Sequence, residues 1–303
     1  MSQITKSRHS FRCFAKINLS LKVLGKRPDG FHNIETLFQT IDLHDVLTIE
    51  LRDTGLSMEC NDQTVPTDER NLVIKAAQLF QQATGSTVNA HFTLEKFIPV
   101  AAGLGGGSSD AAATLKGLNA IHNNPLSSDQ LAALALESGS DVPYFLVGGY
   151  ALGEGRGEVL TPLQELPSMV ILVTYPRFNV TASAAYQYFE LTSEGQISDS
   201  MASGCYHMKE GTVVPRWFND LERGVFARHP EIGNIKGLLM SHGAEKALMT
   251  GSGSSVVALF DTIEAAKEVA KNIYNGEFDI ILAHSITADQ FSQKFVIDQD
   301  ELG

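Results

Sequence analysis

Residues 99–113 read PVAAGLGGGSSDAAA, and the rest of the chain is organised around this stretch. Four glycines in five positions precede two serines and an aspartate, and an alanine-led segment typical of a helix follows. Glycine lets a ligand approach the backbone closely, and serine and aspartate are good residues to begin a helix. Amide groups at the positive end of a helix dipole attract anions. The stretch therefore favours a phosphate-binding loop over a tight turn before a surface helix.

The loop does not fit the common motifs. A Walker A loop needs a lysine after its last glycine, and none follows Gly107. A Rossmann fingerprint needs a third glycine where this chain has Ser108 or Asp110, depending on the starting glycine. The spacing also excludes a nucleophile elbow, and the protein-kinase motifs are absent from the sequence. The loop is therefore of another kind than these four motifs.

The composition is that of an ordinary folded protein and limits its partners. The 303 residues suffice for one large or two medium domains, with two favoured. A net charge of −12 argues against nucleic acid as the main partner, although a locally cationic site could still bind a small anion. Three separated cysteines form neither a zinc pattern nor a disulfide framework, which indicates a reducing cytoplasm. We find no membrane-spanning run and no signal peptide, so we expect no membrane partner.

The N-terminal segment is predicted to form a strand with polar residues on one face. Residues 11–24 alternate with period two, which places Lys16 and Asn18 side by side. From this stretch alone, a solvated strand face is the favoured interpretation. Phe31-His32 follows a turn and opens another extended region, and such a pair is more often a loop anchor than a base-stacking site.

Other elements of the first half follow from apolar spacing, caps and turn residues. We expect strands at 46–51 and 91–97, a polar hairpin and loop at 53–66, helices at 71–84 and 128–137, and a hairpin at 150–160. The strand at 91–97 runs directly into the glycine loop, which is the context that makes such a loop credible. Asp141 lies where a new turn begins, and in isolation a capping aspartate is the favoured interpretation.

A proline-containing connector at 161–167 suggests a domain boundary. Beyond it we expect a buried strand at 169–173, helices at 181–189, 219–227, 231–241 and 262–274, a poorly patterned loop at 193–211, a strand at 256–260 and a closing strand at 278–283. A second glycine cluster, MTGSGSS at 249–255, is either a tight turn or a second wall around a phosphate. The order of strand, helix and strand after two helices favours an α+β layer in the second half of the chain.

Three stretches occur in a fixed order, namely FAKINLSL at 14–21, the glycine loop and MTGSGSS. Together they resemble the GHMP kinase superfamily. The stretches AKINLSLKVLGKRPDGFHNIETLFQTIDLHD at 15–45 and GSDVPYF at 139–145 narrow the resemblance to the 4-diphosphocytidyl-2-C-methyl-D-erythritol kinases. The resemblance covers nearly the whole chain. One departure is Phe31, where that family usually has tyrosine; ring stacking survives the change, whereas a hydrogen bond from the phenol does not.

The resemblance implies an α+β, two-domain GHMP kinase fold with the active site in the cleft between the domains. The expected domains are 1–163, ribosomal-protein-S5-domain-2-like and ATP-binding, and 164–303, a ferredoxin-like α/β sandwich. The implied activity is ATP-dependent phosphorylation of the 2-hydroxyl of 4-diphosphocytidyl-2-C-methyl-D-erythritol in the non-mevalonate (MEP) route to isoprenoid precursors. The alternatives are another GHMP small-molecule kinase, of the homoserine or mevalonate type, and a non-catalytic nucleotide-binding regulator. The presence of both Lys16 and Asp141 argues against the regulator.

The resemblance also implies roles for individual residues. Lys16 and Asp141 match the catalytic pair, in which the carboxylate takes the proton of the acceptor hydroxyl and the lysine offsets negative charge on the transferring group. The positions that match nucleotide contacts are Pro99, Val100, Ala101, Ala102, Gly103, Leu104, Gly105, Gly106, Gly107, Ser108 and Ser109, with Lys96 and Asn71. The positions that match substrate contacts are Asn18, Phe31, His32 and Tyr186, and the second glycine loop contains Gly251, Ser252 and Gly253.

ATP is thus the expected co-substrate. Mg²⁺ is expected to arrive with ATP, because magnesium prefers waters and phosphate oxygens over an all-protein cage. The sequence shows no carboxylate cluster that would hold the ion, so we expect no metal site built by the protein. The other expected partner is a small-molecule cytidine diphosphate substrate, and we expect a monomer or weak homodimer in the cytoplasm.

Overall fold

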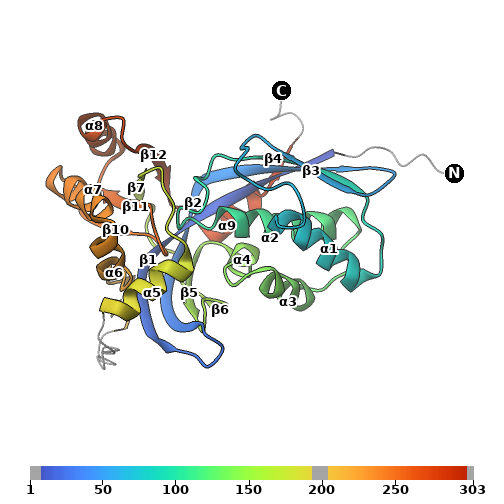
Figure 1. Cartoon of the computed structure of the whole chain (residues 1–303), viewed down its shortest axis with the longest axis horizontal. Coiled ribbons are helices and arrows are strands. Elements are labelled where there is room, and N and C mark those ends of the chain that lie inside the picture. Colours follow the sequence, from blue (N-terminus) through green and yellow to red (C-terminus); the bar gives the residue numbers. More distant parts are fainter. Residues whose placement is uncertain (1–7, 193–203, 299–303) are drawn as a thin grey trace.

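The computed structural model describes residues 8–192 and 204–298, which form two main sheets with helices packed against them (Figure 1). The elements before the connector are β1 (Arg8–Lys26), β2 (His32–Leu51), β3 (Leu56–Cys60), α1 (Leu72–Thr84), β4 (Ala90–Glu95), α2 (Gly106–Ile121), α3 (Ser128–Ser138), α4 (Tyr144–Val147), β5 (Tyr150–Glu154) and β6 (Val159–Pro162). The elements after it are β7 (Val170–Tyr175), α5 (Ala182–Thr192), β8 (Tyr206–Lys209), β9 (Thr212–Pro215), α6 (Glu222–Arg228), α7 (Pro230–Ser241), β10 (Lys246–Met249), β11 (Val256–Phe260), α8 (Ile263–Ile273), β12 (Asp279–His284), α9 (Ala288–Lys294) and β13 (Val296–Ile297).

The first sheet is built on a long antiparallel hairpin of β1 and β2. Its strand order is β13-β1-β2-β4-β3, and β5 pairs with the N-terminal half of β2 and with β6. β2 is one continuous strand, which joins the extended region expected from Phe31-His32 to the strand expected at 46–51. Its first half carries Thr36, Gln39 and Thr40, which are polar but buried, so the apolar period that marks a strand is hidden there.

Local signals predicted some features correctly and others wrongly. Left-handed Gly85 ends α1 and a capping box starts α3, as expected, whereas Asn71 caps α1 instead of belonging to it. The segment at 53–66, where a hairpin and loop were expected, contains β3, and β3 pairs parallel to β4. The expected serine or aspartate cap of α2 is also wrong: the helix starts at Gly106, and left-handed Gly105 occupies the cap position without a side-chain hydrogen bond.

Three apolar clusters hold the layers together. One lies between the first sheet and α1 to α4, and another lies between the second sheet and α5 to α8. The third lies where the two sheets face one another, and Ala15, Ile17 and Leu19 of β1 contribute to it. The intervening polar residues Lys16 and Asn18 are also buried, so the solvated-face interpretation of β1 is wrong. Sequence periodicity cannot show this, because the glycine loops that cover that face come from distant segments.

The second sheet has the order β10-β11-β7-β12 and is antiparallel throughout. The predicted loop at 193–211 contains β8, which forms a hairpin with β9, and residues 193–203 lie outside the described part. β12 does not close the fold, because α9 and β13 follow and β13 pairs with β1 of the first sheet. The boundary expected between residues 163 and 164 stays a prediction.

Candidate active site

The glycine loop has the backbone geometry of an anion cradle. Ala101, Gly103 and Gly105 have φ values of 52°, 82° and 74°, so alternate residues of the loop are left-handed. Such alternation turns successive amide groups towards one side, and concave sites of this kind bind anions. The first-turn amides of α2 have no partner within the helix, and no side chain caps it. The loop therefore presents amide donors and the positive end of a helix dipole together.

The second glycine cluster lies directly against the first. The Ser255 amide donates to the Ala102 carbonyl at 3.2 Å. A Cβ atom on Gly103 would lie 2.2 Å from the Thr250 carbonyl oxygen, which shows how closely the two backbones approach. Buried Asn219 holds the second loop in place by donating through Nδ2 to the carbonyl oxygens of Met249, at 2.7 Å, and Gly251, at 2.8 Å. Both loops thus form one wall.

Lys16 and Asp141 meet beside this wall. The Lys16 ammonium lies 2.7 Å from Asn18 Oδ1 and 3.5 Å from Asp141 Oδ2. The Lys16 side chain is 4% exposed, and the Asp141 side chain is 36% exposed. A backbone hydrogen bond fixes Lys16 to the glycine loop, because the Lys16 amide donates to the Leu104 carbonyl at 2.9 Å. The site therefore contains a buried cation next to a carboxylate that solvent or substrate can reach.

Asn18 connects these groups to the second glycine loop. Its amide donates to Thr250 Oγ1 at 2.9 Å, and its Nδ2 donates to Thr36 Oγ1 at 2.7 Å. The side-chain oxygen Oδ1 of Asn18 is thereby turned towards the Lys16 ammonium. A Cβ on Gly251 would lie 3.2 Å from the Lys16 ammonium, so the backbone of the second loop passes very near Lys16.

Two pockets adjoin the glycine loop and share Gly103 and Gly105 as lining residues. The larger has a volume of about 670 Å³, and the predicted residues that line it are Lys16, Asn18, Phe31, His32, Asp141, Tyr186, Gly251 and Ser252. The smaller has a volume of about 310 Å³, and the predicted residues that line it are Asn71, Lys96, Pro99, Val100, Ala101, Ala102, Gly103, Gly105, Gly106, Gly107 and Ser108. Leu104 and Ser109 are buried beneath the loop and line neither pocket. Gly253 also lines neither.

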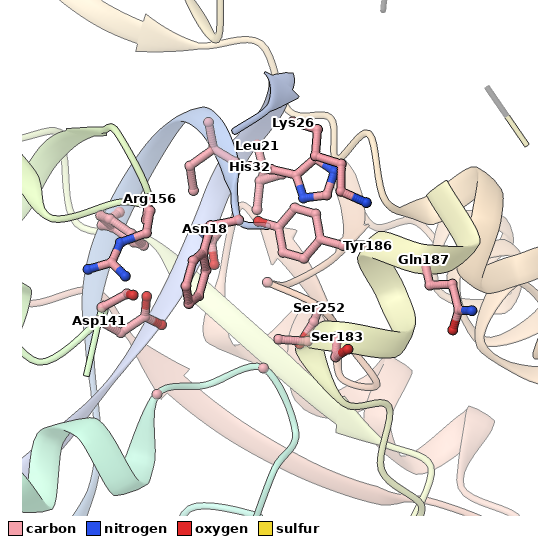
Figure 2. A pocket seen from close by; sticks show the side chains of 18 of the residues that line it. Asn18, Leu21, Lys26, His32, Asp141, Arg156, Ser183, Tyr186, Gln187 and Ser252 are labelled. Carbon is pink, nitrogen blue, oxygen red and sulfur yellow. The ribbon is translucent and has the colours of Figure 1, made fainter. Parts of the chain in front are cut away.

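Aromatic side chains line the larger pocket, and His32 and Tyr186 lie next to one another in it (Figure 2). The rings of His32 and Tyr186 stack with centroids 4.8 Å apart and an interplanar angle of 12°. Phe31 is half exposed, and the Arg156 guanidinium lies 4.7 Å from its ring centroid. In Figure 2, Arg156 and Asp141 lie on one side of the pocket and Tyr186 of α5 lies across from them. Burial and then the charge of Asp141 raise the pKa of Tyr186, so its hydroxyl stays protonated at neutral pH.

Lys96 and Asn71 have structural partners on the smaller pocket's side. The Lys96 ammonium bonds Asp45 and, at 2.8 Å, Asp110, and all three side chains are buried. Burial alone would lower the pKa of Lys96, but the two carboxylates raise it above its ordinary value. Asn71 accepts from the Val73 amide at 2.9 Å as the cap of α1. Direct contact of either residue with nucleotide stays a prediction.

Sequence reasoning missed several residues that line or support the site. Arg156 lies in the turn of the hairpin predicted at 150–160, so its place at the tip of that hairpin was predictable. That it lines the larger pocket was not predictable. Glu190 and Lys26 also line the larger pocket. Glu190 lies four residues after Tyr186, and this helical spacing is the signal that could have placed both on one face of α5. Asn219 carried no local signal.

Among residues 8–192 and 204–298, no group of three or more histidine, cysteine, aspartate or glutamate side chains could hold a metal ion. The expectation that Mg²⁺ arrives with ATP stays a prediction. Within the same ranges, no helix is both long enough and apolar enough to cross a bilayer.

Family models match both halves of the chain. The GHMP kinases N terminal domain matches residues 71–149, which include the glycine loop and Asp141, and the GHMP kinases C terminal model matches residues 212–278. The chain therefore has the two-domain fold of a GHMP kinase.

Individual relatives narrow this class. The 4-diphosphocytidyl-2-C-methyl-D-erythritol kinase of Lachnoclostridium phytofermentans is 42% identical over 262 residues, which cover 85% of this chain and 90% of the relative. A crystal structure of 4-(cytidine 5'-diphospho)-2C-methyl-D-erythritol kinase is 32% identical, with a TM-score of 0.75 over 91% of this chain and 98% of that one. The chain belongs to the 4-diphosphocytidyl-2-C-methyl-D-erythritol kinase family. The homoserine kinase of Cytophaga hutchinsonii, 19% identical with a TM-score of 0.64 over 95% of this chain and 97% of that one, shares the fold alone.

Proposed function

We propose that this chain transfers the γ-phosphoryl group of ATP to the 2-hydroxyl of 4-diphosphocytidyl-2-C-methyl-D-erythritol, a step of the non-mevalonate route to isoprenoid precursors. The observation that carries the proposal is that two pockets share Gly103 and Gly105 of the glycine loop, and that Lys16, which adjoins Gly105, lines the larger of them together with Asp141. A phosphoryl transfer needs this arrangement, because donor and acceptor must approach the same phosphorus from opposite sides. The family relatives support the choice of acceptor.

The chemistry assigns a role to each group. The acceptor hydroxyl oxygen forms a bond to the γ-phosphorus, the bond from that phosphorus to the β–γ bridging oxygen breaks, and ADP leaves. Asp141 takes the hydroxyl proton as general base. Lys16 offsets charge on the transferring group, and Asn18 orients Lys16 through the 2.7 Å hydrogen bond. Mg²⁺ bound to the ATP phosphates would neutralise further charge.

The two ends of the substrates belong in different pockets. The smaller pocket lies over the amide donors at the start of α2, which suit the phosphates of ATP. The larger pocket contains the aromatic rings of Phe31, His32 and Tyr186, which suit a flat base, and the guanidinium of Arg156, which suits a diphosphate or a base edge. A cytoplasmic location, no nucleic-acid partner and a monomer or weak homodimer stay predictions.

The test is ATP consumption with 4-diphosphocytidyl-2-C-methyl-D-erythritol as acceptor. We expect Asp141→Asn to bind ATP like the wild type and to lose turnover on the order of 10²–10⁴-fold. Asp129→Asn, at an exposed position on α3, is the matched control. Wild-type turnover by Asp141→Asn would exclude the base assignment. Equal turnover of homoserine or mevalonate would favour the alternative kinases, and failure with every alcohol despite ATP binding would favour a regulator.

A further inference from the structure

His32 is held on two sides by residues of α5. Tyr186 covers the face of its ring, and Glu190, four residues later on the helix, lies at its edge, with Oε1 3.0 Å from His32 Nε2. The His32 side chain is 7% exposed. Residues at i and i+4 project from the same helix face, so one turn of α5 sets both the plane and the edge of the imidazole. His32 comes from the start of β2, so this contact joins the two halves of the fold.

Glu190 can only accept hydrogen bonds. Lys26 donates to it, with its ammonium 2.8 Å from Oε1 and 3.1 Å from Oε2. This hydrogen bond lowers the pKa of Glu190 below its ordinary value, so the carboxylate is ionised at neutral pH. An ionised carboxylate has no proton to give. The Nε2 atom of His32 must therefore carry the hydrogen of their 3.0 Å contact.

This contact determines what His32 offers to the pocket. In a neutral imidazole only one nitrogen carries a hydrogen, so Nε2–H leaves Nδ1 as an acceptor. Among the described residues, Nδ1 has no hydrogen-bond partner in the protein, and His32 lines the larger pocket. Cytosine presents an amino donor at the position where uracil presents a carbonyl oxygen. A fixed acceptor at Nδ1 matches the amino group and opposes the carbonyl.

We propose that Glu190 is a positioning residue that fixes the tautomer and the ring plane of His32, and that it thereby makes the larger pocket prefer cytosine over uracil. The proposal rests on the proposed function in one respect, because it takes the base of the acceptor substrate to lie beside His32. In this proposal Glu190 acts on the base through its contact with His32.

A merely structural role for Glu190 makes a different prediction. The Lys26–Glu190 ion pair joins the β1–β2 hairpin to α5. In a merely structural role, Glu190 would hold these two elements together, as a clamp, and would not select the base. Lys26→Met removes that ion pair and leaves the contact between Glu190 and His32. Because Lys26 also lines the larger pocket, this variant is judged by the ratio of CDP affinity to UDP affinity and not by its affinity for either nucleotide. A clamp is lost in both Lys26→Met and Glu190→Ala, whereas a tautomer lock is lost only in Glu190→Ala.

The experiment measures binding of CDP and UDP by calorimetry with a non-hydrolysable ATP analogue bound. Glu190→Ala should lower the CDP-over-UDP preference on the order of 10-fold to 100-fold, while Lys26→Met keeps the wild-type preference within about threefold. A Glu190→Ala preference within about twofold of the wild type overturns the proposal, and so does an equal loss in Lys26→Met. Binding needs no turnover, so loss of the CDP preference is distinct from failure of the proposed reaction.

Nitrogen NMR of ¹⁵N-histidine-labelled protein tests the same contact without any ligand. The His32 signals are assigned by their absence in His32→Gln, and the spectra are recorded near pH 8, about where an unperturbed imidazole is neutral. The wild type should show Nε2 protonated and Nδ1 bare, and Glu190→Ala should show a mixture. A wild-type His32 protonated at Nδ1 overturns the proposal, and this result is obtained even where Glu190→Ala does not fold.

Discussion

The contact between the two glycine loops makes a sharp prediction at Gly103. A Cβ atom there would lie 2.2 Å from the Thr250 carbonyl oxygen and 3.0 Å from that of Gly253, whereas ordinary contact begins at 3.4 Å. Both obstacles are backbone atoms, so no side chain can rotate away. The Gly103 φ of +82° adds strain for any other residue, about 1–2 kcal/mol for the left-handed region. Gly103→Ala must therefore separate the loops.

The magnitude follows from the displacement. Widening the gap from 2.2 Å to 3.4 Å moves one loop relative to the other by about 1 Å, and a misplacement of that size costs on the order of 10²-fold in rate. Gly251, on the displaced loop, adjoins Lys16 and Asn18, so we expect the loss to fall on kcat. The assay is steady-state ATP consumption with both substrates varied, together with the melting temperature.

Gly55→Ala is the matched control. Its φ is +70°, and a Cβ there meets nothing within 4 Å, so this variant carries the backbone strain without the clash. We expect it to lose about 1–2 kcal/mol of stability and to keep the wild-type kcat. If Gly103→Ala also kept kcat within about threefold of the wild type, the contact between the loops would not be needed for catalysis, and the reasoning would be refuted.

Two further predictions concern the base end of the pocket and the buried cluster. Phe31→Ala should raise the KM for the cytidylated acceptor far more than that for ATP, because Phe31 lines only the larger pocket, while Phe31→Tyr keeps both; equal increases in the two KM values would contradict this. Burial raises the pKa of Asp110 from 3.8 to about 7; the charge of Lys96 opposes this rise and the charge of Asp45 adds to it. Between pH 3.8 and about pH 7 the folded state therefore binds more protons than the unfolded state, and the free energy of unfolding falls as the pH rises. The melting temperature of the wild type should therefore fall relative to that of Asp110→Asn from about pH 5 to about pH 8, and a difference independent of pH would count against the shift.

Much of the local structure was predictable because its causes are local. The capping box that starts α3 and the left-handed Gly85 that ends α1 each depend on a few neighbouring residues. The prediction that the glycine loop binds phosphate is local in the same way, since it follows from backbone freedom and a helix start. The cap of α2 was mispredicted because Gly105 takes a left-handed φ, which no side-chain preference reveals.

Motif order in the sequence was enough to place the chain among the GHMP kinases and to select Lys16 and Asp141. Neither motif order nor periodicity could predict the burial of Lys16. The loops that cover Lys16 are remote in the sequence, and a period-two pattern reports only which side of a strand a residue is on. The approach of Gly103 to Thr250 and the hold of Glu190 on His32 likewise exist only once the two sheets pack face to face. Local conformational preferences are written in neighbouring residues, whereas distances between remote segments are set by the shared core, and the catalytic geometry depends on those distances.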